Sequence, residues 1–276
     1  MKAGLDESIC VFGAGVILRY VKAMQMEVAG ARQAGDLEYI HRMRVASRRL
    51  RTALPLFGKC LPAKKLDGWQ KEVRAITRAL GAARDTDVQL DLLKRTYKDA
   101  PLPIYRPGLR RLALRLAQRR AKMQARVTTA LDELESSQAL AQLEAAVTPR
   151  AARQEEVYIY TPALYQLGFQ SIASALEQFL SYDRYVSLPE EVEKLHAMRI
   201  AAKHLRYTLE TFAPLYPEAL KRFVNTLRNA QESLGDIHDC DVWQTYLPQF
   251  LEKETRRVQR FYGSARPARR LTPGLT

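Results

Sequence analysis

The chain has 276 residues, of which 47% are apolar and 27% are charged, an ordinary balance for a soluble globular protein. Lysine and arginine number 44 against 30 acidic residues, so the formal net charge is +14, which favours a polyanionic partner. Cys10, Cys60 and Cys240 show no CxxC spacing, which argues against a disulfide framework or a zinc knuckle and suits a reducing cytoplasm. No apolar run reaches the roughly 18 residues of a transmembrane helix, so we expect no membrane partner.

Helical periodicity runs through nearly the whole chain, and Gly and Pro fall between the periodic segments. The first segment contains ICVFGAGVIL, which we interpret as the core face of a helix because Asp6, Glu7 and Arg19 flank it. We predict an all-α fold of long helices with short connections, as in antiparallel bundles. The expected helices cover about 8–30, 36–58, 62–81, 85–98, 106–146, 162–183, 189–213, 217–234 and 239–262, followed by a loop-like tail, GSARPARRLTPGLT.

An internal repeat organises the chain. HRMRVASRRLR (41–51) matches HAMRIAAKHLR (196–206) at an offset of 155, with six of eleven positions identical. LGAARDTDV (80–88) then matches LGDIHDCDV (234–242) at an offset of 154. Two matched blocks in the same order indicate a duplicated unit of about four helices, with repeats at 1–150 and 151–276. The basic segment that ends the second repeat is shorter than its counterpart at 106–126.

Each copy of the first block places cations on one face of a helix. At about 100° per residue, four basic side chains fall within an arc of about 80°, opposite an apolar face that includes Met43 and Leu50. Like charges at these spacings destabilise a helix by a few tenths of a kcal/mol per pair, so the pattern indicates a compensating anion. A solvated helix face is the alternative. The first strip is His41, Arg44, Arg48 and Arg51, and the second strip is His196, Arg199, Lys203 and Arg206, with Tyr207 at its edge.

The chemistry of these side chains suits phosphate. Arginine offers a planar fork of donors to phosphate oxygens, lysine offers a point charge, and a histidine beside phosphate should shift toward its charged form. Other basic positions share helix faces and are secondary candidates, although each alone is more often solvated. They are Arg74, Arg78, Arg228, Arg19, Lys22, Arg119 and Lys122.

The LGxxxDxDV blocks are predicted to be structural. Gly81 and Gly235 suit the residue after a helix, and Asp85 and Asp239 suit the N-cap of the next helix. The second aspartate of each block, Asp87 or Asp241, then falls at N2, where its negative charge interacts favourably with the helix dipole. These aspartates could also buttress nearby arginines.

The two blocks in tandem resemble the CHAD domain family over essentially the whole chain. The resemblance implies two four-helix bundles related by pseudo-two-fold symmetry, with a basic groove or pore between them that binds inorganic polyphosphate. It implies no enzymatic activity and an association with polyphosphate granules. The family's basic positions correspond to the two strips, with Arg49 and His204 at their flanks.

We therefore predict a non-catalytic, cytoplasmic polyphosphate-binding module without cofactor or metal, in which sulfate or phosphate ions could occupy the site in crystals. One alternative is nucleic-acid binding, although the strips lack interleaved aromatics for base stacking. Another is a metal-dependent phosphohydrolase using His238 and Asp239. The repeat argues against the latter because Arg84 occupies the position that matches His238.

Overall fold

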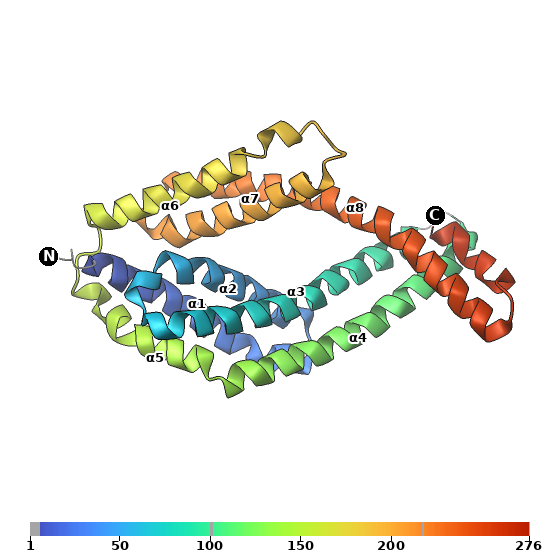
Figure 1. The fold of residues 1–276 in the computed structure, drawn as a ribbon, viewed down its shortest axis with the longest axis horizontal. Helices are drawn as coiled ribbons and strands as arrows, with labels where there is room; N and C mark the ends of the chain where they lie inside the picture. The colour runs from blue at the N-terminus through green and yellow to red at the C-terminus, as the bar shows by residue number, and fades with distance from the viewer. Residues whose placement is uncertain (1–5, 100–101, 217, 276) are drawn as a thin grey trace.

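The computed structural model describes residues 6–99, 102–216 and 218–275, and within them the chain is helical without a β-strand. The predicted all-α class is confirmed. Helices α1 to α5 form the first half and α6 to α8 the second, with α8 reaching back toward the start of α4 and the C-terminal tail (Figure 1). The α-helices are α1 Glu7–Gln33, α2 Leu37–Leu56, α3 Ala63–Asp99, α4 Arg106–Ser136, α5 Ala139–Ala151, α6 Pro162–Leu180, α7 Val192–Phe212 and α8 Ala219–Tyr262.

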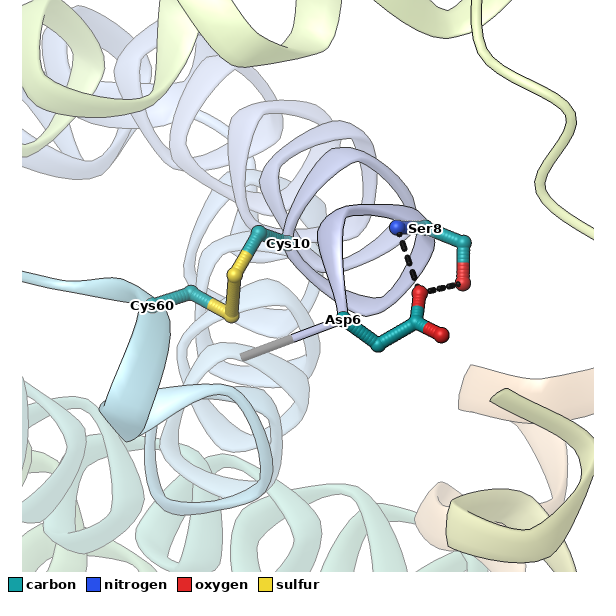
Figure 2. Close-up of a disulfide and its surroundings, with 4 residues drawn as sticks. All are labelled: Asp6, Ser8, Cys10 and Cys60. Atoms are coloured by element: carbon teal, nitrogen blue, oxygen red, sulfur yellow. Dashed lines mark hydrogen bonds between the residues drawn. A yellow bond between two sulfur atoms is a disulfide. The ribbon is translucent and has the colours of Figure 1, made fainter. Parts of the chain in front are cut away.

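Helix α1 is the central core helix of the first half. Asp6 caps it by accepting a 2.9 Å hydrogen bond from the Ser8 amide and a second from the Ser8 hydroxyl (Figure 2). The helix packs against α2, α4 and α5, and its apolar side chains are buried among them. By length and hydropathy α1 could also cross a membrane, but 50% of its most apolar window is buried inside the protein.

Cys10 on α1 and Cys60 in the 3₁₀ turn Gly58–Cys60 form a disulfide, with their Cα atoms 5.2 Å apart (Figure 2). The expectation from cysteine spacing was wrong on this point. The pairing depends on how the end of α2 returns to the start of α1, which the spacing of cysteines in sequence does not reveal. Cys240 is exposed and free. The cysteines therefore no longer support a reducing compartment.

The LGxxxDxDV blocks lie inside continuous helices, so the predicted breaks at Gly81 and Gly235 are wrong. Helix α3 runs through residues 63–99, and α8 runs through 219–262. A single interior glycine costs a helix only about 1 kcal/mol, which tertiary contacts overcome. The one predicted helix at 106–146 is instead divided into α4 and α5, where Gln138 adopts a left-handed φ of 52°.

The repeat extends further than the two matched blocks. At the offset of 155, the N-cap Asp6 corresponds to Thr161, which caps α6 by accepting from the Leu164 amide. Gly13 packs closely on Phe57, and the matching Gly168 packs on Phe212. The offset of 155 between the two halves therefore applies from the N-cap residues Asp6 and Thr161 onward.

The two halves differ in the number of long helices that the structure describes. Within the described residues the second half has three long helices, α6, α7 and α8, where four had been expected. The predicted loop-like tail instead forms the 3₁₀ segment Arg266–Gly274, which packs on α4 and α8. No described helix takes the place in the second half that the end of α4 and α5 occupy in the first.

Candidate functional site

A cavity of about 860 Å³, which we call the cationic cavity, opens between the two halves. One wall comes from α2 and α3, and the other comes from α6, α7 and α8. A second cavity of about 840 Å³ around Trp243 and Leu247 is mainly apolar and offers little chemistry to an anion. The titratable side chains that line the cationic cavity are Arg44, Arg48, Arg51, Asp85, His196, Arg199, Lys203, His204, Tyr207 and His238.

Arg44 and Arg199 occupy matching positions in the two walls. Arg44 Nη2 lies 3.6 Å from Asp85 Oδ1, so the aspartate buttresses this guanidinium. A Cβ atom at Gly81 would lie 3.9 Å from Arg44 Nε, and one at Gly235 would lie 3.7 Å from Arg199 Nη2. The two glycines therefore lie beside the guanidiniums within continuous helices, and not at the predicted helix ends.

The Nε atoms of Arg44 and Arg199 are both buried, and neither has a hydrogen-bond acceptor among the described residues. Leaving a buried donor unsatisfied costs about 1–3 kcal/mol, and more for a charged group. The cost occurs at the same position of both repeats, in side chains that line one cavity. The two arginines therefore have unused capacity to bind an acceptor.

Lys203 lies close to the guanidiniums of Arg199, Arg48 and Arg44. Burial lowers the pKa of Lys203 to about 7, and the guanidiniums of Arg199 and Arg48 contribute to the shift. An ammonium ion in this position is disfavoured until negative charge arrives. An anion in the cavity would raise the pKa again and draw a proton onto the lysine.

Two histidines meet at the edge of the cavity. The Nδ1 atoms of His196 and His238 are 3.2 Å apart, so one ring donates to the other. Burial lowers the pKa of each histidine. The expected shift toward the charged form would therefore require a bound anion.

His238 also lines the cavity, a position that the sequence patterns did not predict. Its counterpart Arg84 lies close enough to His41 to help burial lower the pKa of that histidine. The signal was present in the matched blocks, because both repeats carry a basic residue at this position.

Three predicted residues lie beside the cavity, not in its lining. Arg49 Nε donates to Glu210 Oε2 at 2.8 Å, and Arg206 Nε lies 3.7 Å from Glu210 Oε1. Because Arg49 is on α2 and Glu210 is on α7, this carboxylate ties the two halves together. His41 is partly buried and its Nδ1 has no partner among the described residues.

The secondary candidates separate into two groups. Arg74 and Arg78 lie near Arg51, whose pKa is lowered first by burial and then by Arg48 and these two neighbours. They extend the positive field of the first strip along α3. The remaining candidates are exposed and outside the cavity lining, namely Arg228, Arg19, Lys22, Arg119 and Lys122.

The other aspartates of the repeated blocks have separate roles. Asp87 is buried and accepts from Arg120 Nε of α4 at 2.5 Å, which anchors α4 on α3. Asp241 lines a neighbouring cavity of about 630 Å³ together with His196 and His238, and Asp239 is exposed. None of them caps a helix, because α3 and α8 continue through them.

Comparison with known protein families supports the repeat-based resemblance. The family model described as the CHAD domain matches residues 15–248, which include both strips and both LGxxxDxDV blocks. The chain belongs to the CHAD domain family. CHAD domains are linked in general to polyphosphate binding. No curated protein matches the chain in sequence.

Two solved structures share the fold. The crystal structure of the CHAD domain from the plant Ricinus communis is 23% identical, with a TM-score of 0.68, and covers 97% of this chain and 91% of that chain. PptA from Streptomyces chartreusis is 17% identical, with a TM-score of 0.56, and covers 96% and 90%. At these identities the likeness concerns the fold of a CHAD domain and not the ligand.

Proposed function

We propose that this CHAD domain binds inorganic polyphosphate in the cationic cavity without catalysing a reaction on it. The observation that carries the proposal is the matched pair Arg44 and Arg199 on opposite walls of one cavity, whose buried Nε atoms have no acceptor in the part of the chain that the structure describes. A linear polymer with a negative charge at each phosphate can reach both walls at once. A single small anion would meet fewer of the lining cations.

The chemistry of the cavity fits this ligand. Guanidinium groups bind phosphate oxygens through two parallel hydrogen bonds, and Arg48 and Arg51 extend the row of donors along α2. A bound anion raises the pKa of Lys203 and of the pair His196–His238, so these groups take up protons and the cavity becomes more positive when the ligand is bound. Residues that only flank the cavity, such as Arg74 and Arg78, contribute through the longer-range field.

The decisive test removes the two unsatisfied guanidiniums. We expect Arg44→Gln with Arg199→Gln to weaken polyphosphate binding at least about 100-fold, because each charge-assisted contact contributes about 1.5–3 kcal/mol. Titration calorimetry at fixed ionic strength would measure the dissociation constant, and circular dichroism would verify helicity. The matched control is Arg119→Gln with Lys122→Gln, which removes two exposed charges on α4. Equal affinity in the two double variants would overturn the proposal.

Salt dependence gives a second measure of the same binding. Each neutralised phosphate releases counterions, so the logarithm of the affinity should fall linearly with the logarithm of the salt concentration. The slope should be smaller in the cavity variant than in the control variant.

Nucleic acid is the competing ligand, and displacement of polyphosphate by short RNA or DNA at equal phosphate concentration would contradict selectivity for the inorganic polymer.

Hydrolysis is the competing activity. Within the described residues no group of three His, Cys, Asp or Glu side chains is placed to hold a metal ion, and His238 faces His196. Incubation of polyphosphate with the protein and Mn²⁺ or Mg²⁺ should release no phosphate. Release that disappears in an Asp239→Asn variant would establish catalysis instead.

We place the protein in the cytoplasm, at polyphosphate granules, because that is where a cavity for this polymer would meet its ligand. The Cys10–Cys60 disulfide points the other way, since disulfides persist mainly in oxidising compartments. Cell fractionation with thiol trapping decides between the two. Protein found in the cytosolic fraction with both thiols reduced supports the cytoplasmic placement, and oxidised protein in an extracytoplasmic fraction contradicts it.

A further inference from the structure

The second half carries a face of large apolar side chains that no described helix covers. We call it the α6/α8 face. The spacings of four, seven and fourteen residues place its members on one side of each helix, and both helices pack on α7 and contribute to one small hydrophobic cluster there. The face consists of Phe169, Leu176 and Leu180 on α6 with Phe223 and Ile237 on α8, all of them exposed.

The repeat shows that this face should be buried. At the offset of 154, Phe223 on α8 corresponds to Trp69 on α3, yet Phe223 is 54% exposed and Trp69 is 3% exposed. Ile237 is 43% exposed, whereas the matching Ala83 is fully buried at 0%. In both cases the residue in the second half is a large apolar side chain exposed where its counterpart lies in a core.

The side chains of α6 differ in exposure from their counterparts on α1 in the same way. At the offset of 155, Leu176 is 41% exposed, whereas its counterpart Val21 on α1 is 0% exposed. Leu180 corresponds to Gln25, whose Nε2 donates to Glu144 of α5 at 2.8 Å. This hydrogen bond identifies α5 as the helix that lies over the equivalent face of the first half.

The covering segment of the first half is the end of α4 together with α5. Its inward side chains are buried against α1 and α3, and they include Val127, Leu131, Leu143 and Val147. The described residues provide no such segment for α6 and α8. Large apolar side chains that are exposed where their counterparts lie under another helix are typical of an interaction surface.

The charges around the face favour a second copy of the same chain as the occupant. Two molecules with a net charge of +14 repel one another over most of their surfaces. In the sequence, the exposed acid Glu177 follows Leu176 and the exposed acid Asp236 precedes Ile237. The exposed Arg222 precedes Phe223. In a two-fold arrangement Glu177 of one copy can approach Arg222 of the other, because each copy presents the same face.

We infer that two copies of this CHAD domain dock through their α6/α8 faces, each covering the helices that α4 and α5 cover in the first half. The inference is independent of polyphosphate binding, because Gln178 lines the cationic cavity from the opposite side of α6. The face therefore remains available whether or not the cavity is occupied.

The experiment measures molecular mass in solution for three proteins. Sedimentation velocity of the full chain, over a hundredfold range of concentration, should show wild type approaching twice 31.5 kDa at the upper end. Leu176→Glu with Phe223→Glu should remain at 31.5 kDa throughout, since facing carboxylates would repel. The matched control is Leu114→Glu with Phe261→Glu, which changes two exposed apolar residues away from the face and should dimerise like wild type.

Each outcome has a clear meaning. Wild type that stays monomeric over the whole range overturns the inference, as does a dimer that persists unchanged in the double variant. A second variant, Phe169→Gln with Leu180→Gln, removes apolar area without adding charge and should weaken the dimer at least about tenfold, by the loss of two buried side chains. Circular dichroism and retained polyphosphate binding would show that the variants are folded.

Discussion

The two walls of the cationic cavity carry the same pattern of charge in chemically different side chains. Arg48 in the first strip corresponds to Lys203 in the second, and Arg84, which is outside the cavity lining, corresponds to His238. The arginines stay charged at every physiological pH, whereas burial brings the pKa of Lys203 to about 7 and lowers that of His238. The first wall thus has a fixed charge, and the second has a charge that responds to the ligand and to pH.

The two halves also differ in how the same positions are fastened. Cys10 and Cys60 are joined by a disulfide. Their counterparts at the offset of 155 are Tyr165 and Leu215, and the Tyr165 hydroxyl donates to the Leu215 carbonyl at 3.5 Å. The duplication has kept the contact and changed its chemistry, from a covalent bond to one long hydrogen bond.

The largest expected effect comes from the contact that joins the halves. Phe212 is fully buried and its ring lies 6.0 Å from Phe57, its counterpart, and 6.1 Å from Phe12. We expect Phe212→Ala to lower the free energy of unfolding by about 3–5 kcal/mol, through lost burial and the cavity that remains. Urea denaturation would measure the loss, with Phe261→Ala, an exposed aromatic, as control. A loss below about 1 kcal/mol would show that the halves do not share a core.

Removal of the disulfide should cost somewhat less. We expect Cys60→Ser to destabilise the protein by about 2–4 kcal/mol, because the unfolded chain regains the freedom of a closed loop. Tyr165→Phe, the matched change in the second half, should cost at most about 1 kcal/mol. Thermal denaturation with and without reductant would measure both. Reductant should destabilise wild type and leave Cys60→Ser unchanged, and an unaffected wild type would contradict the disulfide.

The smallest expected effect concerns pH and polyphosphate affinity. Burial and the neighbouring cations hold the pKa of Lys203 near 7 in the free protein, and a bound anion raises it. Below that pH the lysine is already charged, so its contribution to binding is complete. Above it, binding must take up a proton, and the affinity should fall by at most about tenfold per pH unit. Calorimetry across the pH range would measure this slope.

Two variants sharpen the comparison of the walls. Lys203→Arg should flatten the decline in affinity above neutral pH, because the side chain then stays charged. Arg48→Lys places a titratable group in the first wall and should steepen the decline. Identical pH profiles for wild type and Lys203→Arg would show that this lysine is not the group that titrates on binding.

Much of the site could be read from the sequence because helical spacing and a duplicated block are local properties. The strips on α2 and α7 were located from the positions of Arg44 and Arg199 and their neighbours. The departures are Arg49 and Arg206, which lie beside Glu210, and His41, which is also outside the cavity lining. Which side of a cationic arc faces a carboxylate on another helix depends on how the helices pack, and periodicity along one helix carries no information about that.

The sequence by itself determined the all-α class, the duplication and the family, because these follow from side-chain periodicity and matched residue types. Tertiary structure alone decided that Gly81 and Gly235 lie inside continuous helices, beside the guanidiniums of Arg44 and Arg199. It also decided the pairing of Cys10 with Cys60 and the exposure of the α6/α8 face. The physical reason is common to all three. Each depends on which distant segments pack together. The free energy of that packing can outweigh the helix-breaking preference of a glycine. Cysteine spacing and the apolar periodicity of one helix do not show which segments will meet.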